Sequence, residues 1–189
     1  AFLRMEQLIE EGASMIDLGA VSSRPGSIAV PAQEELTRIK PILDLIKEKK
    51  LYEKAEFSLD SYEPSVIQYA LDCGFSIIND ITGLQNDKVA KLAGEYKAKV
   101  VIMHMQNDPS TMQKEPFYED VIEEIHNFFK ERIDKAHSFG VEDIILDVGI
   151  GFGKTLEHNL LLLKPHEHFR YFAYELLIGA SRKSMINAI

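Results

Sequence analysis

Short apolar runs recur along the chain, and each of them ends in a polar residue. They cover residues 15–19, 56–61, 76–81, 99–105, 143–149 and 175–182. Short runs rich in Val, Ile and Leu are typical of buried strands. Longer amphipathic stretches lie between the runs, at residues 34–50, 64–74, 87–97 and 118–140. The pattern therefore predicts an alternation of strands and helices.

This alternation determines the type of sheet. Strands that are joined by helical crossovers run parallel, and strands that are apolar on both faces indicate a sheet that is covered on both sides or closed. Gly12, Gly74 and Gly140 each end a helical stretch before a strand, as glycines do just after a helix C-terminus. No linker or low-complexity segment interrupts the pattern. We therefore expect one domain over residues 1–189.

The length of the chain bears on the architecture. Helical stretches at residues 2–12 and 183–189 lie outside the outermost predicted strands. A (β/α)8 barrel typically needs about 250 residues, which is more than this chain has. We expect an α/β fold of the (β/α)8 TIM barrel type that lacks its first and last strands in this chain. The domain would then hold strands two to seven with their flanking helices.

Composition narrows the classes of function. The formal net charge of −9 argues against a nucleic-acid partner, and no apolar run is long enough for a membrane helix. The single Cys73 lacks a partner for an intramolecular disulfide, which favours a reducing compartment. We therefore expect a cytoplasmic protein without a nucleic-acid or membrane partner. An anionic small substrate remains compatible with the charge, because four basic residues at predicted loop positions could form a local positive patch: Arg24, Lys154, Arg182 and Lys183.

Polar residues stand at the predicted carboxyl ends of the strands, where ligands bind in parallel α/β folds. They are Asp17, Asp60, Asn79, Asp80, His104 and Asp147, followed by Ser181, Arg182 and Lys183. Any one of them taken alone is more often a turn residue, a helix cap or a packed side chain. Six strands that end in this way favour a shared site.

The segment from Asp147 to Thr155 contains three glycines, a Lys and a Thr, which suggests a phosphate-binding loop. That loop requires a Gly five positions before Gly153, where this chain has Val148. Asp147 would also repel a phosphate at this place. These two features argue against a nucleotide site, and we expect Lys154 to have a structural role.

The motifs resemble those of the dihydropteroate synthase family, the folate-biosynthesis enzymes that sulfonamides inhibit. Residues 17–26 are similar to the family's second-strand motif, Asp-Ile-Gly-Gly-Glu-Ser-Thr-Arg-Pro-Gly. Further matches in the family's order are residues 58–83, 103–105, 146–163 and 179–186. The resemblance implies condensation of 6-hydroxymethyl-7,8-dihydropterin pyrophosphate with p-aminobenzoate, which gives 7,8-dihydropteroate and pyrophosphate.

The resemblance also implies roles for individual residues. Residues expected to bind the pterin are Asp60, Asn79, Met103, Asp147 and Lys183. Residues expected around p-aminobenzoate are Ser23, Arg24, Pro25, Phe152, Lys183 and Ser184. Asp60 would stabilise positive charge on the pterin methylene, with Lys183 and Arg24 as its catalytic partners. A carboxylate suits the pterin because it accepts two parallel N–H bonds from the guanidine-like edge of the ring. Arg182 could equally be a strand-end ion-pair residue.

Some family features are changed or absent. Val21 stands where the family has Glu, and Val148 stands where it has Pro. The first-strand motif that supplies a Mg²⁺ contact has no counterpart, so Mg²⁺ is expected with the substrate's pyrophosphate but without a ligand from this chain. We also expect a homodimer. Two alternatives are a methyltetrahydrofolate-binding domain of a corrinoid methyltransferase and an inactive pterin-binding fragment.

Overall fold

The computed structural model describes residues 1–24, 26–164 and 167–179. Within these ranges the strands are β1 (Met15–Leu18), β2 (Glu56–Asp60), β3 (Ile77–Asp80), β4 (Lys99–Met103), β5 (Ile144–Asp147) and β6 (Glu175–Leu177). The helices are α1 (Phe2–Glu10), α2 (Ala32–Lys49), the 3-10 turn η1 (Leu51–Glu53), α3 (Pro64–Asp72), α4 (Asp87–Tyr96), α5 (Val121–Ser138), α6 (Leu156–Leu163) and α7 (Glu167–Arg170). Every strand lies inside a run predicted from the sequence, and α2 to α5 confirm the four amphipathic helices.

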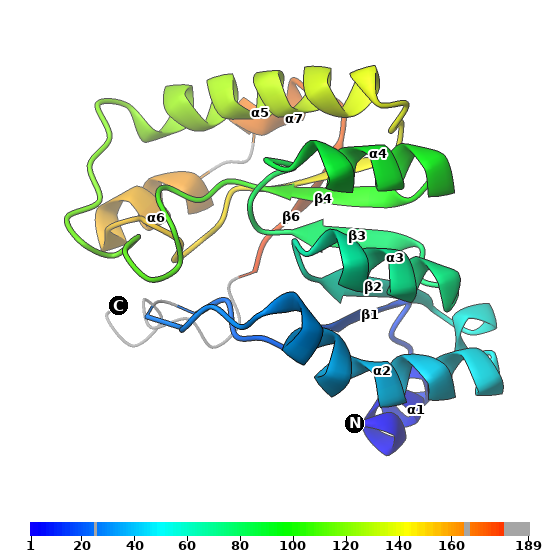
Figure 1. Ribbon diagram of the computed structural model, residues 1–189. Coiled ribbons are helices and arrows are strands. Elements are labelled where there is room, and N and C mark those ends of the chain that lie inside the picture. Colours follow the sequence, from blue (N-terminus) through cyan, green and yellow to red (C-terminus); the bar gives the residue numbers. More distant parts are fainter. Residues whose placement is uncertain (25, 165–166, 180–189) are drawn as a thin grey trace.

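The six strands form a single sheet whose strand order follows the chain from β1 to β6. All neighbouring strands pair in parallel, as the alternation predicted. Figure 1 shows β1 to β4 following one another in chain order, with α2 to α5 along the side of the sheet. Sequential parallel strands with helical crossovers are the arrangement of a (β/α)8 barrel. The predicted fold class is confirmed, and the described residues supply six consecutive strands.

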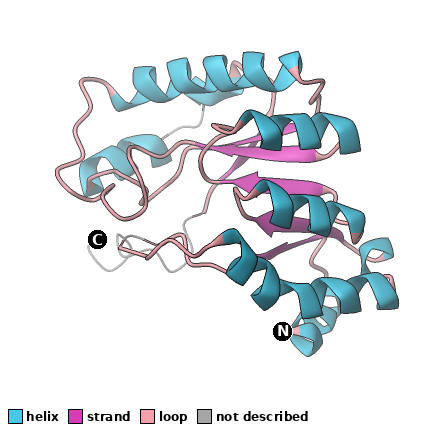
Figure 2. Cartoon of the chain, in the orientation of Figure 1, coloured by secondary structure: helices cyan, strands magenta, loops and turns pink. Residues whose placement is uncertain are grey.

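Alternation along each strand divides the sheet into two faces. One face packs against the helices and forms the large core, in which Phe57, Ile78 and Ile102 are buried. The opposite face carries a smaller cluster of Ile77, Val101 and Ile145. Figure 2 shows the strands as a layer with the helices α2 to α5 on one side. The small cluster therefore marks the concave face, which is the interior side in a barrel.

Sequence spacing explains how the longest crossover helix packs. The buried residues of α5 are Val121, Ile125, Phe129, Ile133 and Ala136, which recur at helical spacing. The residue before the helix is Asp120, whose carboxylate caps it by accepting hydrogen bonds from the N–H groups of Ile122 and Glu123. These features fix both the start of the helix and the face that it buries.

The predicted glycines after helix C-termini are confirmed. Gly12, Gly74 and Gly140 have φ angles of 97°, 96° and 80°, a region in which a Cβ atom is strained. Cys73 lies just before Gly74 and is buried, with 3% of its surface exposed. No helix within residues 1–24, 26–164 and 167–179 has the length and apolar character that crossing a membrane requires.

Candidate active site

Side chains from several strand ends share the concave face. The cluster on that face consists of Met15, Ile77, Val101 and Ile145. Two positions further along each strand, on the same face by alternation, stand Asp17, Asn79, Met103 and Asp147. The strand pairing sets Asp60 opposite Asn79 and Met103 opposite Asp147. The structure therefore brings together four residues predicted to bind a pterin.

Asn79 links two strand ends on the concave face. Its side-chain N–H₂ donates to Asp17 Oδ1 and Oδ2, at 3.4 and 3.3 Å. Removal from water raises the pKa of Asp17, while hydrogen bonds from Ser58 and Asn79 lower it. The amide of Asn79 is therefore oriented by a neighbouring carboxylate.

Asp147, the last residue of β5, is buried, with 7% of its surface exposed. Its Oδ1 accepts the N–H of Gly149 at 2.8 Å, and its backbone oxygen accepts the N–H of His104 at 2.9 Å. The bond from Gly149 is local and fixes the direction of the carboxylate, whereas the bond from His104 ties the backbone at the end of β5 to the end of β4. The orientation of the Asp147 side chain is therefore set by the protein itself. This is expected of a carboxylate that recognises the flat, hydrogen-bond-donating edge of a ring.

The glycines after Asp147 hold close backbone contacts. Gly149, Gly151 and Gly153 have φ angles of 67°, 80° and 62°. A Cβ atom on Gly149 would lie 2.0 Å from the carbonyl oxygen of His104. The glycines thus allow the chain after β5 to pass directly over the end of β4, and this packing explains them without a phosphate ligand.

An apolar cluster completes the rim beside these polar groups. It consists of Ile81, Met103, Met112 and Phe152, with Tyr62 and Met105 packed against it. Two predicted site residues, Met103 and Phe152, therefore lie in one cluster. Flat aromatic and thioether surfaces are suited to packing against a planar ring.

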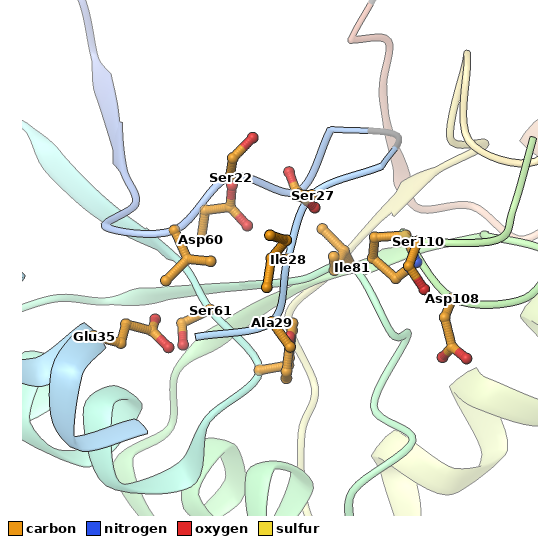
Figure 3. A pocket seen from close by; sticks show the side chains of 14 residues that line it. Ser22, Ser27, Ile28, Ala29, Glu35, Asp60, Ser61, Ile81, Asp108 and Ser110 are labelled. Atoms are coloured by element: carbon orange, nitrogen blue, oxygen red, sulfur yellow. The ribbon is translucent and has the colours of Figure 1, made fainter. Parts of the chain in front are cut away.

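A cavity of about 310 Å³ opens at the same end of the sheet, next to Asp60. It is lined by Val21, Ser22, Ser23, Ser27, Ile28, Ala29, Glu35, Asp60, Ser61, Tyr62, Ile81, Asp108, Pro109 and Ser110. Ser23 and Asp60 were predicted as site residues, whereas Glu35, Tyr62 and Asp108 were not. In Figure 3, Glu35 and Ser61 lie side by side near one end of the cavity, and Asp108 lies at the other. Arg24 is exposed and is not among the lining residues.

The charged groups lining this cavity are acidic. Glu35 is buried, with 4% of its surface exposed, and burial raises the pKa of its carboxyl while a hydrogen bond from Ser61 lowers it. Burial and the nearby carboxylates, including Asp60 and Asp108, raise the pKa of Tyr62. The cavity therefore favours ligand groups that are positive or that donate hydrogen bonds.

Two polar strand-end residues do not join the site. Asp80 follows Ile78 by two positions, so it points toward the helix side, where it is fully buried. Its Oδ1 accepts the N–H and hydroxyl of Thr82, at 2.7 and 2.6 Å, and its Oδ2 accepts the N–H of Leu84 at 3.1 Å. Burial raises the pKa of Asp80. The side chain of Asp80 therefore holds the turn that follows β3.

His104 follows the helix side of β4 in the same way. Its ring meets the ring of Phe128 edge-on at 5.0 Å, and 7% of its surface is exposed. Burial, together with the charge of Lys154, lowers the pKa of His104 to about 2. Lys154 is itself buried, with 3% of its surface exposed, so its expected place in a positive surface patch was wrong. The expectation of a structural role for Lys154 agrees with this burial.

Three predicted site residues lie outside the described residues: Pro25, Lys183 and Ser184. Two of the four residues expected in the positive patch, Arg182 and Lys183, also lie outside the described residues. Within the described ranges, no three His, Cys, Asp or Glu side chains converge as metal ligands would. The described side chains alone do not fit a Mg²⁺ ion.

Comparisons with known proteins follow the same motifs. The family model described as pterin binding enzyme matches residues 1–189. The chain is 43% identical over 183 residues to the bifunctional dihydropteroate synthase/dihydropteroate reductase of Helicobacter pylori, covering 97% of this chain and 48% of that protein. This chain therefore spans about half the length of that relative.

Solved structures give the same result at the level of the fold. The Yersinia pestis dihydropteroate synthase, solved as a sulfonamide drug complex, has a TM-score of 0.91 and 35% identity, covering 98% of this chain and 68% of that one. The Thermus thermophilus dihydropteroate synthase, in complex with 4-aminobenzoate, has a TM-score of 0.91 and 37% identity, covering 100% of this chain and 71% of that one. The match to the family model over the whole chain confirms the resemblance seen in the motifs: the chain belongs to the family of pterin binding enzymes.

Proposed function

We propose that this chain provides the pterin site of a dihydropteroate synthase of folate biosynthesis. The observation that carries the proposal is the placement of Asp60, Asn79 and Asp147 at the carboxyl ends of β2, β3 and β5, along one edge of the sheet. An apolar rim that contains Met103 and Phe152 lies beside them. A relative and two solved structures named dihydropteroate synthase support the same function.

Recognition of the pterin rests on complementary hydrogen bonding. The carboxylate of Asp147 accepts two N–H bonds from the aminopyrimidinone edge, and the amide of Asn79 contacts the same ring. Met103 packs against a ring face, and Lys183 adds a further contact. The anchored Oδ1 of Asp147 supports this role, because a fixed acceptor needs little reorganisation when the ligand binds.

The proposed reaction is a substitution at the pterin methylene. The bond from the methylene carbon to the pyrophosphate oxygen breaks, and its electron pair leaves with the pyrophosphate. The amine nitrogen of p-aminobenzoate then forms the new bond to that carbon and releases a proton. Asp60 stabilises the positive charge that develops on the methylene, which is strongest in the transition state. The acidic cavity beside Asp60 is compatible with that charge.

The second substrate occupies the side formed by the loop after β1. Ser23, Arg24, Pro25, Phe152, Lys183 and Ser184 surround p-aminobenzoate in this proposal. Arg24 and Lys183 also assist departure of the pyrophosphate. Mg²⁺ would enter the site bound to the pyrophosphate of the substrate. Sulfonamides occupy the place of p-aminobenzoate. A homodimer and a cytoplasmic location belong to the same proposal.

The test is formation of dihydropteroate from the two substrates, measured by chromatography. Asp60→Asn should lower turnover on the order of 10²-fold, the size seen when one electrostatic stabiliser of a transition state is removed. Pterin affinity should fall much less, because the charge that Asp60 stabilises is absent in the ground state. Equal losses in turnover and affinity would make Asp60 an ordinary binding residue. Methyl transfer from methyltetrahydrofolate to cobalamin, with no dihydropteroate formed, would replace the proposal by the corrinoid alternative.

A further inference from the structure

A buried ammonium group lies beneath the candidate pterin site. Lys154 Nζ lies 3.0 Å from His104 Nδ1 and 3.2 Å from the backbone oxygen of His104. It also lies 3.1 Å from the oxygen of Gly149 and 3.0 Å from the oxygen of Phe152. A single cation therefore contacts four acceptors from two segments of the chain.

This arrangement is costly unless it serves a specific purpose. Withdrawing an ammonium group from water costs on the order of several kcal/mol, and only well-placed hydrogen bonds offset this cost. An apolar side chain of similar length could fill the same volume without that cost. The charge therefore contributes something that packing alone cannot, namely a fixed arrangement of the backbone oxygens around it.

The contacted atoms belong to the segments that carry the site. His104 directly follows Met103 at the end of β4 and donates its N–H to the backbone oxygen of Asp147 at 2.9 Å. The N–H of Gly149 binds the side chain of Asp147, and Phe152 is part of the apolar rim. Lys154 thus ties the chain on either side of the pterin contacts to a common point.

We propose that Lys154 is a positioning residue for pterin binding: its buried ammonium holds the segment 149–152 against the end of β4 and thereby orients Asp147 and Phe152. The inference rests on the proposed function, because it assigns Lys154 a task in that same site. Lys154 acts through the backbone, without touching the ligand. His104 supports it as a neutral acceptor.

The deciding variant is Lys154→Met, which keeps an unbranched apolar chain and removes the charge. Binding of pterin-6-carboxylic acid to the full protein is measured by calorimetry, at a temperature where circular dichroism shows each variant to be folded. The dissociation constant should rise roughly tenfold, as expected when fixed hydrogen bonds in a site are lost. The amide proton resonance of Gly149 should move in the same variant, because its bond to Asp147 is loosened.

Two further variants make the outcome specific. Lys135→Met is the matched control, since Lys135 also binds a loop oxygen, that of Gln85 at 2.9 Å, and pairs with Asp87 at 2.6 Å. Its pterin affinity should equal that of the unchanged protein. His104→Phe keeps an aromatic ring and removes one of the four acceptors, so it should raise the dissociation constant about threefold, a fraction of a typical hydrogen-bond contribution. It also serves if Lys154→Met does not fold.

The possible results separate the two proposals. Failure of the unchanged protein to bind the pterin overturns the proposed function. If the unchanged protein binds, while Lys154→Met or, should that not fold, His104→Phe binds equally well with an unmoved Gly149 resonance, the positioning role is overturned. Weaker binding by these variants, together with normal binding by Lys135→Met, supports it.

Discussion

Two glycine-containing loops at the same end of the sheet differ sharply in how they are held. In the β5–α6 loop (residues 148–155), Ile150 is 1% exposed, whereas in the β1–α2 loop (residues 19–31) Ile28 is 87% exposed. Asn159 accepts the N–H of Gly151 at 2.8 Å, and Tyr118 donates to the oxygen of Gly153 at 2.8 Å. The first loop is thus fixed by side chains from elsewhere in the fold.

The β1–α2 loop has a lighter attachment. The N–H of Gly26 donates to the oxygen of Pro109 at 3.0 Å, and the N–H of Arg24 donates to the hydroxyl of Ser22 at 3.3 Å. The contrast teaches that this fold places a preformed surface beside a second surface that a ligand can still shape. We therefore expect the pterin side to bind without adjustment and the p-aminobenzoate side to close afterwards.

The largest expected difference concerns one glycine from each loop. Gly149→Ala would place a Cβ atom 2.0 Å from the oxygen of His104, at a φ of 67°, whereas Gly26→Ala meets nothing within 4 Å at a φ of 79°. We expect Gly149→Ala to cost about 3 kcal/mol or more in unfolding free energy, and Gly26→Ala about 1 kcal/mol. Urea unfolding measures both. Similar losses in the two variants would contradict the contrast between the loops.

The next prediction concerns the acceptor that the fixed loop supports. Asp147→Asn replaces one acceptor oxygen by a donor, and so leaves a pterin N–H unpaired in a buried site. We expect a loss of about 1–3 kcal/mol in binding free energy, roughly fivefold to 150-fold in the dissociation constant. Calorimetry with pterin-6-carboxylic acid checks this. An unchanged affinity would remove Asp147 from the site.

Lowering the pH should destabilise the protein at the β5–α6 loop, through protonation of His104. The folded-state pKa of about 2 lies below the ordinary value of 6.5, so the stability linked to the neutral ring is complete above pH 6.5 and is lost as the pH falls toward 2. Between pH 7.5 and pH 5.5 we expect the free energy of unfolding to fall by about 1.4 kcal/mol, because pH 5.5 lies one unit below the pKa of His104 in the unfolded chain. The comparison is urea unfolding of the unchanged protein and of His104→Phe, in which this part of the pH dependence should vanish. The same slope in both would exclude His104 as its source.

The smallest expected effect belongs to the exposed loop. Pyrophosphate should draw the guanidinium of Arg24 inward and so improve the binding of a sulfonamide. Arg24→Ala should remove about 1 kcal/mol of that gain and leave pterin affinity unchanged. Titration of a sulfonamide with and without pyrophosphate measures the gain, and Lys114→Ala, another exposed cation, is the control. If pyrophosphate improves sulfonamide binding to Arg24→Ala as much as it does for the unchanged protein, Arg24 does not close the site.

Sequence reasoning located the strands and their carboxyl ends, because burial and turn signals are local. It could not decide which of two adjacent polar residues faces the site. Asn79 and Asp80 both end β3, yet the first lies on the concave face and the second is buried in a turn. Asn79 lies on the same face as Ile77, and Asp80 lies on the same face as Ile78. This separates the two polar residues once Ile77 is known to belong to the concave cluster.

Other features depend on contacts that are distant in the chain. Glu35 lies in the first turn of α2, where an acid is expected for reasons of helix polarity alone, and only the fold places it in the cavity beside Ser61. Lys154 was correctly expected to be structural, but its partner His104 lies 50 positions away. Lys183 and Ser184 stay predictions, since they lie outside the described residues.

The single cysteine makes the chain a reporter of its own opening. The thiol of Cys73 sits at the junction of α3 and β3, and burial raises its pKa, so little reactive thiolate exists in the closed state. Alkylating reagents should therefore modify Cys73 only when this junction separates transiently. With one thiol in the sequence, the labelling rate follows that one event without interference from other sites.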